Sequence, residues 1–397
     1  MYYKYSILIP TFNRRKYLEK TLETILDQNY DNYELIVSDS GSSDDTWEYL
    51  KKLDYPQLKI IKPEKKLSEV ENFEFIINQA KGEWIVLIGD DDGVLPKFFT
   101  NIDDIIKKHP DVEAISSRSG YYYHENIQDK YGNRVISFNY LSRKISKVNS
   151  KKSLFFCLLG IYTRADVPML YTSGVIKKSL VDKIKKKSQN KFFHSIIEDY
   201  YSMVAILNET KSYVRCEKPL FWIGTSESSS GRGLRIYENN ENVEDFLKLS
   251  DHVSETLHKV GISSIYFLEA IFKHPYINSF WKSKIISLLA HLCAFNDIQN
   301  RNEIHTFKNN LKRDEILKEI MNEIKKNNHS IFLFYILKLI LNIVNNLIKV
   351  SKLNIKILNF FKKKLFKKSF FDINSSDRDK YPSLPACNKI INKILKK

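Results

Sequence analysis

Short apolar runs alternate with helix-forming stretches through the first third of this 397-residue chain. The pattern predicts strands at Tyr5–Ile9, Glu34–Ser38, Leu58–Ile61, Glu83–Ile88 and Val112–Ser116, and helices at Arg15–Gln28, Asp44–Leu53, Ser68–Ala80 and from about Pro96. Strands that alternate with helices form a parallel sheet with helices on both faces. The apolar run EWIVLI agrees, because strands of such a sheet are buried on both sides. We therefore expect a doubly wound α/β fold.

The remainder of the chain is less regular and predicts further domains. The pattern weakens over 119–152, which we interpret as a loop-rich insertion, and a strand at Leu170–Lys177 and a helix at His194–Asn208 are expected after it. A single hydrophobic core stops growing at about 250–300 residues, so more than one domain is needed. We expect a sheet-containing domain over 1–232, a helical region over 233–329 and a basic amphipathic tail over 330–397.

Composition narrows the class of protein and its surroundings. Lys and Arg number 63 against 47 Asp and Glu, and the formal net charge of +16 favours an anionic partner. The four cysteines, Cys157, Cys216, Cys293 and Cys387, are isolated, so reduced thiols are expected rather than a disulfide framework or a zinc site. The N-terminus shows no signal-peptide pattern, and we expect the chain to remain in the cytoplasm.

Polar clusters follow three of the predicted strands, where a doubly wound sheet binds its ligands. They are Pro10–Arg14, Ser38–Asp44 and Gly89–Gly93. Each could be an ordinary strand-to-helix loop with a helix cap. The third cluster is different, because Asp90, Asp91 and Asp92 are three consecutive carboxylates that repel one another at the end of a buried strand.

A bound cation would make this acidic cluster tolerable, and oxygen ligands suit Mg²⁺ or Mn²⁺. A divalent ion that bridges a diphosphate would also neutralise charge on a nucleotide leaving group. The sequence has neither the glycine-rich fingerprint of dinucleotide binders nor the phosphate loop that ends in Gly-Lys-Ser/Thr. The carboxylates and a metal would therefore have to hold the phosphates.

The order of these motifs resembles the family-2 glycosyltransferases. YSILIPTFNRRKYLEKTLETILDQNYDNYELIVSDSGSSDDT is similar to the opening of that family, and AKGEWIVLIGDDDGVLP is similar to its metal-binding segment. The resemblance is strong over Tyr5–Ile115 and weaker as far as about Ser230. It implies a GT-A-like doubly wound mixed sheet, followed here by a helical C-terminal region with an amphipathic tail.

The resemblance also implies a nucleotide site. Thr11, Asn13 and Arg14 lie where the first loop of the family contacts the nucleotide. Asp39 matches the aspartate that hydrogen-bonds the base, which is usually uracil. Asp90 corresponds to a position near the ribose and the phosphates.

The implied metal site depends on the same acidic cluster. Asp91 falls on the aspartate that ligates the metal most directly. The family often has an Asp-any-Asp arrangement, and here Gly89 occupies its first position. Either Asp90 or Asp92 then serves as the companion carboxylate, and we assign Asp92 to the metal.

An inverting transfer needs a carboxylate that takes the proton from the acceptor hydroxyl, and such a base is worth roughly 10²–10⁴ in rate. Glu198 and Asp199 in FFHSIIEDYYSMVAIL resemble the Glu-Asp pair of the family, which makes Asp199 the base. A solvated acidic pair favoured by a helix dipole is the alternative. Many relatives place an Arg and a His after a later aromatic strand, but Phe221–Glu227 has neither. Arg232 could replace that contact, although an exposed turn is the simpler interpretation.

The predicted tail is aliphatic and basic. From Lys338 onward, Lys and Asn recur in steps of three and four and draw one stripe along a helix. No run of about 20 apolar residues is free of Lys or Asn, which argues against a membrane span. A helix lying in the interface keeps its Lys groups at the headgroups, where each adds about 1 kcal/mol of attraction to anionic lipid. The alternative is packing on the protein itself or on a second subunit, and the aliphatic face argues against nucleic acid.

Together these features predict an inverting glycosyltransferase that uses Mn²⁺ or Mg²⁺. The expected donor is a nucleotide-diphosphate sugar, in particular a UDP-sugar. The expected acceptor is lipid-linked or a glycan, at the inner membrane surface, in the biosynthesis of lipopolysaccharide, capsule or exopolysaccharide. A homo-oligomer is compatible with the sequence. A sugar nucleotidyltransferase, whose usual glycine-rich opening is missing, and a non-catalytic relative that acts as a binding or scaffold protein are the two alternatives.

Overall fold

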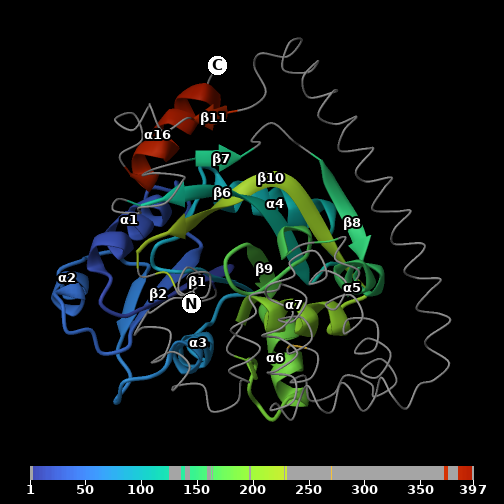
Figure 1. Ribbon diagram of the computed structural model, residues 1–397, viewed down its shortest axis with the longest axis horizontal. Coiled ribbons are helices and arrows are strands. Elements are labelled where there is room, and N and C mark those ends of the chain that lie inside the picture. The colour runs from blue at the N-terminus through green and yellow to red at the C-terminus, as the bar shows by residue number, and fades with distance from the viewer. Residues whose placement is uncertain are drawn as a thin grey trace, which may run out of the picture. The chain divides into compact units, whose positions relative to one another are not determined.

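The computed structural model describes residues 3–124, 136–138, 144–158, 162, 164–195, 198–227, 229, 270, 371–373 and 383–395 (Figure 1). The chain divides into two compact units. The first holds Met1–Val253, Glu269–Tyr276 and Asp372–Lys397, and the second holds Ser254–Leu268 and Ile277–Phe371. Apart from Phe371, every described residue falls in the first unit. The domain boundaries predicted at 232 and 329 lie among residues outside this description and stay predictions.

The first part of the sheet is parallel, as the sequence predicts. Its strands are β1 (Tyr5–Thr11), β2 (Tyr33–Asp39), β3 (Leu58–Ile61) and β4 (Trp84–Leu87). β1 pairs in parallel with both β2 and β4, and β2 pairs in parallel with β3. Every residue of β1, β2 and β4 is buried. The uninterrupted apolar runs therefore occupy the centre of the sheet, where both faces are covered.

Helices connect these strands close to the predicted positions. They are α1 (Arg15–Leu26), α2 (Thr46–Lys51), α3 (Glu69–Ile77) and α4 (Phe98–Lys108). α1 buries Leu18, Leu22 and Ile25, which is the apolar face expected from the sequence. α4 begins two positions after Pro96, because Lys97 before it adopts a left-handed conformation with φ of 62°.

The rest of the sheet is mixed. It contains β5 (Gly93–Val94), β6 (Ala114–Tyr123), β7 (Ile136–Phe138), β8 (Ile145–Asn149), β9 (Gly174–Lys177), β10 (Ser212–Thr225) and β11 (Phe371–Ile373). The main path of the 11-stranded sheet runs β11-β7-β6-β9-β4-β1-β2-β3, and β10 pairs with β5, β6 and β8. β9 is antiparallel to β4 and β6, whereas β10 runs parallel beside β6 (Figure 1). The mixed sheet of the expected fold is thus confirmed.

Helical segments also occur between these later strands. They are α5 (Ser150–Leu158), the short 3₁₀ turn η1 (Arg164–Asp166), α6 (Lys178–Lys187) and α7 (Glu198–Glu209). The stretch 119–152, predicted to be an insertion or a loop-rich excursion, is not loop-rich in its described part, because that part contains the end of β6, β7, β8 and the start of α5. β8 is exposed or half-buried along its whole length, so its polar residues give no apolar pattern.

The last helix, α16 (Leu384–Leu395), corrects part of the predicted tail. It lies beside α1 in the first unit (Figure 1), and Leu384 and Cys387 are buried there. The amide of Asn388 accepts a hydrogen bond from Nε1 of Trp222 at 2.9 Å and donates one to the carbonyl of Val94 at 2.9 Å. Residues 384–395 therefore belong to the sheet domain rather than to a membrane-associating tail. The Lys stripe that begins at Lys338 lies outside the described residues.

Among the described helices, none combines the length and the apolar character that a membrane crossing requires.

Candidate active site

The three predicted polar clusters meet at one edge of the sheet. β1, β2 and β4 are parallel neighbours, so the loops that follow them emerge on the same side. The register places Thr11 at the end of β1 opposite Asp39 at the end of β2. The hydroxyl of Thr11 donates to Oδ2 of Asp90 at 2.7 Å, which joins the first cluster to the acidic one.

The acidic loop is buried and tightly folded. Asp90, Asp91 and Asp92 are only 3%, 5% and 2% exposed. The backbone N–H of Asp92 donates to the carbonyl of Gly89 at 3.2 Å, so the loop closes on itself. From α1, the hydroxyl of Thr21 lies 2.8 Å from the carbonyl of Asp90 and 2.6 Å from that of Asp92. The sheet and α1 thus fix the backbone that presents these carboxylates.

Arg14 supplies the positive charge that the acidic loop needs. Its guanidinium forms ion pairs with Asp90, at 3.1 Å from Nε to Oδ1, and with Oδ2 of Asp91. Burial acts against the charged guanidinium, but the two carboxylates outweigh it and raise the pKa of Arg14. A cation of the protein itself therefore bridges the first two acids.

The three carboxylates titrate differently because their surroundings differ. Burial raises the pKa of Asp90 to about 7, against the lowering effect of Arg14, and the neighbouring Asp91 adds to the rise. Burial, together with the charge of Asp91, raises the pKa of Asp92 to about 7. Burial also acts to raise the pKa of Asp91, but Arg14 and His124 outweigh it, so that this pKa is lowered. Asp91 is therefore the acid of the three that holds its negative charge most firmly.

Strand β10 and the residues after it complete the surroundings of Asp91. The hydroxyls of Ser226 and Ser229 each donate to Oδ2 of Asp91 at 2.7 Å. The backbone N–H of Gly224 donates to Oδ1 of Asp92 at 2.8 Å. A Cβ atom on Gly224 would lie 1.6 Å from the carbonyl oxygen of Asp91, so only glycine permits this approach.

The sequence did not reveal these β10 contacts. The family resemblance points to an Arg and a His near Phe221–Glu227, whereas the chain places hydroxyl groups there. The signal that could have found them is the run of serines after a strand that ends in Gly-Thr. Arg232, the suggested replacement, lies outside the described residues.

His124 at the end of β6 is another site residue that sequence reasoning missed. Its Nε2 lies 2.9 Å from the carbonyl oxygen of Asp91, so this nitrogen is the donor. The rings of Tyr17 and Tyr122 contact the imidazole edge-on, with centroids 4.8 and 4.9 Å away. Burial lowers the pKa of His124. The neutral imidazole thus supports the backbone of Asp91 through this hydrogen bond.

Asp39 has the features expected of a group that recognises a nucleobase. It is completely buried at the end of β2, and its Oδ1 accepts from the backbone N–H of Ser42 at 2.8 Å and from its hydroxyl at 2.6 Å. Its Oδ2 is buried and has no hydrogen-bond partner in the described part of the chain. Buried carboxylate oxygens are rarely left unpaired, and an N–H of a ligand would satisfy this one.

Asn13 ties the first two loops together. It adopts a left-handed conformation with φ of 56°, and its Oδ1 accepts from the backbone N–H groups of Ser43 at 2.7 Å and Asp44 at 3.3 Å. Its own N–H donates to the hydroxyl of Ser42 at 2.8 Å. In the described structure, therefore, Asn13 shapes the edge of the predicted nucleotide site through backbone contacts.

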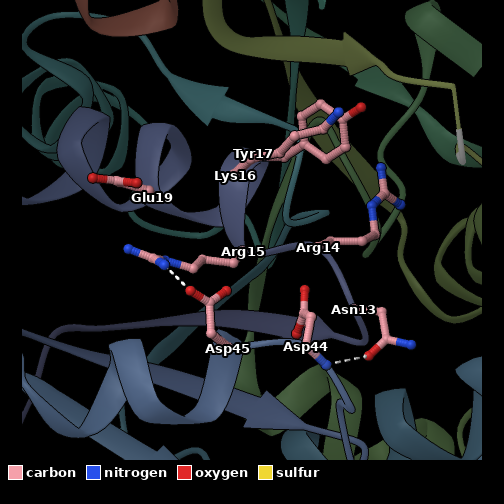
Figure 2. A pocket seen from close by; sticks show the side chains of 8 residues that line it. All are labelled: Asn13, Arg14, Arg15, Lys16, Tyr17, Glu19, Asp44 and Asp45. Atoms are coloured by element: carbon pink, nitrogen blue, oxygen red, sulfur yellow. Dashed lines mark hydrogen bonds and ion pairs between the residues drawn. The ribbon is translucent and has the colours of Figure 1, made fainter.

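A pocket of about 310 Å³ opens where these loops meet the start of α1. It is lined by Asn13, Arg14, Arg15, Lys16, Tyr17, Glu19, Asp44 and Asp45. Figure 2 shows that Arg15 turns toward Asp45, with which it pairs, while Arg14 points the other way. The two successive arginines thus have different partners, and of the two only Arg14 contacts the acidic loop.

Asp199 lies in the first turn of α7, as the sequence predicts. Its Oδ2 accepts from Nη1 of Arg164 at 2.9 Å, and its Oδ1 accepts from the backbone N–H of Tyr200 at 2.8 Å. These partners belong to η1 and α7, so among the described contacts Asp199 is held separately from the acidic loop. The adjacent Glu198 is buried.

The site offers a divalent cation only part of its ligands. No group of three or more His, Cys, Asp or Glu side chains among the described residues is arranged to hold a metal ion. Asp92, which was predicted to ligate metal, uses both carboxylate oxygens to accept backbone N–H groups, from Gly89 at 2.9 Å and Gly224 at 2.8 Å. The described donors to Asp91 all reach its Oδ2. Such a set fits Mg²⁺ or Mn²⁺ sites in which substrate phosphates supply most of the ligands.

Comparison with known proteins agrees with the motifs. Residues 6–175 match the family model of glycosyl transferase family 2. Over 95 residues, 23% of this chain and 31% of the relative, the sequence is 36% identical to the GalNAc(5)-diNAcBac-PP-undecaprenol beta-1,3-glucosyltransferase of Campylobacter jejuni. Over 90 residues, 21% of this chain and 28% of the relative, it is 37% identical to a dolichyl N-acetyl-alpha-D-glucosaminyl phosphate 3-beta-D-2,3-diacetamido-2,3-dideoxy-beta-D-glucuronosyltransferase of Methanococcus voltae.

A longer but weaker match covers more of both chains. Over 220 residues, 54% of this chain and 74% of the relative, the identity to the UDP-Glc:alpha-D-GlcNAc-diphosphoundecaprenol beta-1,3-glucosyltransferase WfgD of Escherichia coli is 24%. With the Campylobacter and Methanococcus enzymes, by contrast, this chain matches less than a third of the relative's length. The matched residues carry the parallel strands, the acidic loop and the first two loops described above. Residues 6–175 of this chain therefore form a glycosyl transferase family 2 domain.

Proposed function

We propose that the chain transfers a sugar from a nucleoside-diphosphate sugar to an acceptor hydroxyl with inversion at the anomeric carbon. One observation carries this proposal: the acidic loop, Arg14 and Asp39 meet at one edge of the sheet, and Oδ2 of Asp39 is buried there with no hydrogen-bond partner among the described residues. Uracil fits this acceptor, because its ring N–H is a donor at the Watson–Crick edge. The name of the Escherichia coli relative also contains a UDP-sugar donor.

The diphosphate of the donor would lie against Arg14 and the acidic loop. Asp90 would stay with the nucleotide, and Asp92 would brace Gly89 and Gly224 rather than contact the ligand. A bound Mn²⁺ or Mg²⁺ held by Asp91 and the phosphate oxygens would neutralise the negative charge that develops on the leaving diphosphate. Ser226 and Ser229 keep the carboxylate of Asp91 in one orientation for that purpose.

Asp199 would act as the general base. It takes the proton from the acceptor hydroxyl, while the hydroxyl oxygen attacks the anomeric carbon from the face opposite the diphosphate. The bond from that carbon to the phosphate oxygen breaks, and its electron pair leaves on the nucleoside diphosphate. Both atoms and charge then balance as glycosylated acceptor, nucleoside diphosphate and one proton.

The acceptor is proposed to be a lipid-linked saccharide of surface-polysaccharide biosynthesis. The names of the Campylobacter and Escherichia relatives contain undecaprenol-diphosphate acceptors. The Lys stripe that begins at Lys338 would hold the enzyme at the inner membrane surface. Deleting residues 330–370 should release the protein from anionic vesicles without abolishing donor binding, and unchanged sedimentation with the vesicles would contradict this part.

Donor turnover tests the central proposal. The purified chain would be incubated with UDP-glucose, UDP-N-acetylglucosamine, UDP-galactose and GDP-mannose, with Mn²⁺ and a synthetic polyprenyl-diphosphate saccharide, and nucleoside diphosphate would be measured. We expect release with at least one UDP-sugar, dependent on both the metal and Asp91. Release of pyrophosphate from a nucleoside triphosphate and a sugar phosphate would indicate a nucleotidyltransferase instead. No turnover and no calorimetric binding across the panel would indicate a non-catalytic protein.

A further inference from the structure

The candidate base is held by a cation from a separate part of the chain. Nη1 of Arg164 donates to Oδ2 of Asp199 at 2.9 Å, and the two side chains are 37% and 14% exposed. The backbone N–H of Tyr200 holds the other carboxylate oxygen at 2.8 Å. Two donors on two oxygens fix the plane of the carboxylate. Each oxygen still has a second lone pair that can accept the proton of a hydroxyl.

The turn that carries Arg164 is anchored to the centre of the sheet. From β6, Arg118 donates to the carbonyl of Ala165 at 2.9 Å and pairs with Asp166 at 2.9 Å. From β10, the hydroxyl of Tyr213 donates to the carbonyl of Asp166 at 2.8 Å. Arg118 thus holds both Ala165 and Asp166, and Tyr213 adds a second contact to Asp166.

Arg118 is itself fixed on its other side. Its Nε donates to Glu217 of β10 at 2.8 Å, and Glu217 also pairs with Arg215 at 3.1 Å. Arg215 approaches Asp166 at 3.7 Å. The four side chains form a closed network of alternating charge between two paired strands and η1. A lone exposed ion pair contributes about 0–1 kcal/mol and specifies little, but a network of this kind fixes geometry.

We propose that Arg164 is a positioning residue for Asp199, and that the network around Arg118 holds the turn from which it acts. The proposal rests on the proposed function, because it assigns a task to the base of that reaction. Arg164 orients the carboxylate toward the acceptor hydroxyl and balances its charge on the side away from the incoming proton. Reaction rates are sensitive to such orientation, and a displacement of about 1 Å costs about 100-fold.

A double-mutant cycle in the full-length chain distinguishes this task from a purely structural one. The variants are Arg164→Met, Arg164→Lys, Asp199→Asn and the double variant Arg164→Met with Asp199→Asn. Lys178→Ala is the matched control, since it removes an exposed ion pair with Asp182 on α6. Transfer rate at saturating donor and acceptor, UDP binding by calorimetry and the melting temperature are measured for each. Adding guanidinium ion to Arg164→Met gives a further readout, because it replaces the lost group.

Arg164→Met should lower kcat by about 10- to 100-fold with UDP affinity and melting temperature close to wild type, and guanidinium should restore part of the rate. The kcat of Arg164→Lys should lie between the values of wild type and Arg164→Met, because an ammonium keeps the positive charge but lacks the planar fork of a guanidinium. In the Asp199→Asn background the same change should have no further effect, since both residues act through one step. The Lys178→Ala control should match wild type.

Three results would overturn the assignment. One is a wild-type kcat for Arg164→Met. Another is that Arg164→Met lowers kcat by the same factor in the wild-type chain and in the Asp199→Asn variant. The third is a loss of rate explained by a lowered melting temperature and not rescued by guanidinium. If the wild-type chain shows no transfer, the proposed function fails and this assignment fails with it. Transfer that requires Asp199 but not Arg164 refutes the positioning role alone.

Discussion

The clearest quantitative test concerns Asn388, which ties the last helix to the site. Asn388 is only 7% exposed, and its amide bonds Nε1 of Trp222 and the carbonyl of Val94, each at 2.9 Å. Trp222 and Val94 are themselves fully buried on β10 and β5, next to the residues that frame the acidic loop. The change Asn388→Ala removes both bonds at once.

The expected loss of stability follows from these two bonds. Removing one partner of a buried hydrogen bond costs about 1–3 kcal/mol, so the two together give about 2–6 kcal/mol. Water can enter the space left by the amide and satisfy part of the loss, which favours the lower end, about 2–3 kcal/mol. With a urea m-value of about 2–3 kcal/mol per M, the unfolding midpoint should fall by about 1 M.

Urea unfolding followed by tryptophan fluorescence measures this shift. Lys389→Ala is the matched control, because Lys389 is the next residue of the same helix and its 3.9 Å ion pair with Glu23 is exposed. The control should stay within about 0.5 kcal/mol of wild type. Equal midpoints for Asn388→Ala and wild type, or an equal fall for both variants, would refute the inference that α16 is part of the sheet domain.

Further predictions concern the site itself. Asp91→Ala should abolish transfer and Asp199→Asn should lower its rate by roughly 10²–10⁴-fold, but calorimetry should show that only the former weakens Mn²⁺-dependent binding of UDP. Gly224→Ala should lower UDP affinity by more than about tenfold, roughly 1.4 kcal/mol, because a Cβ there would meet the carbonyl of Asp91 at 1.6 Å; wild-type affinity would contradict the described contact. Asp90 and Asp92 bind protons more tightly in the folded chain, since burial raises each pKa from 3.8 to about 7. Their stabilising contribution is therefore complete at low pH and is lost as the pH rises through 7. In EDTA the melting temperature should fall from about pH 4 to about pH 7, and Asn at both positions should flatten that fall; an unchanged slope in the double variant would count against it.

Much of the fold was readable from local pattern. The run EWIVLI predicts a strand buried on both faces, and β4 is one. The apolar face of α1 and the strand β3 were also predicted correctly, β3 with its exact bounds. These features depend on residues a few positions apart, so the hydrophobic periodicity of a helix or a strand is visible in the sequence.

The second half of the sheet was harder to predict. β8 lies exposed or half-buried and carries Ser, Lys and Asn, so no apolar alternation distinguishes it from a loop. Its pairing with β10 joins residues about 60 positions apart, such as Val148 and Tyr213. A strand of this kind is stabilised by its neighbour, and sequence pattern alone does not reveal the neighbour.

The sequence by itself determined the parallel strands and the three loops at their ends, the acidic loop among them, because each is encoded by one short stretch of chain. The tertiary structure alone decided that Arg14 pairs with Asp90 and Asp91, that Ser226 reaches Asp91 across 135 positions, and that Asn388 reaches Val94 across 294. The reason is physical: a hydrogen bond or an ion pair depends on distance in space, and packing of the whole sheet brings these side chains within 3.1 Å of their partners. Asp91 and Asp92 are indistinguishable as neighbouring aspartates in the sequence. Their surroundings in the fold lower the pKa of Asp91 and make Asp92 the acceptor of two backbone N–H groups.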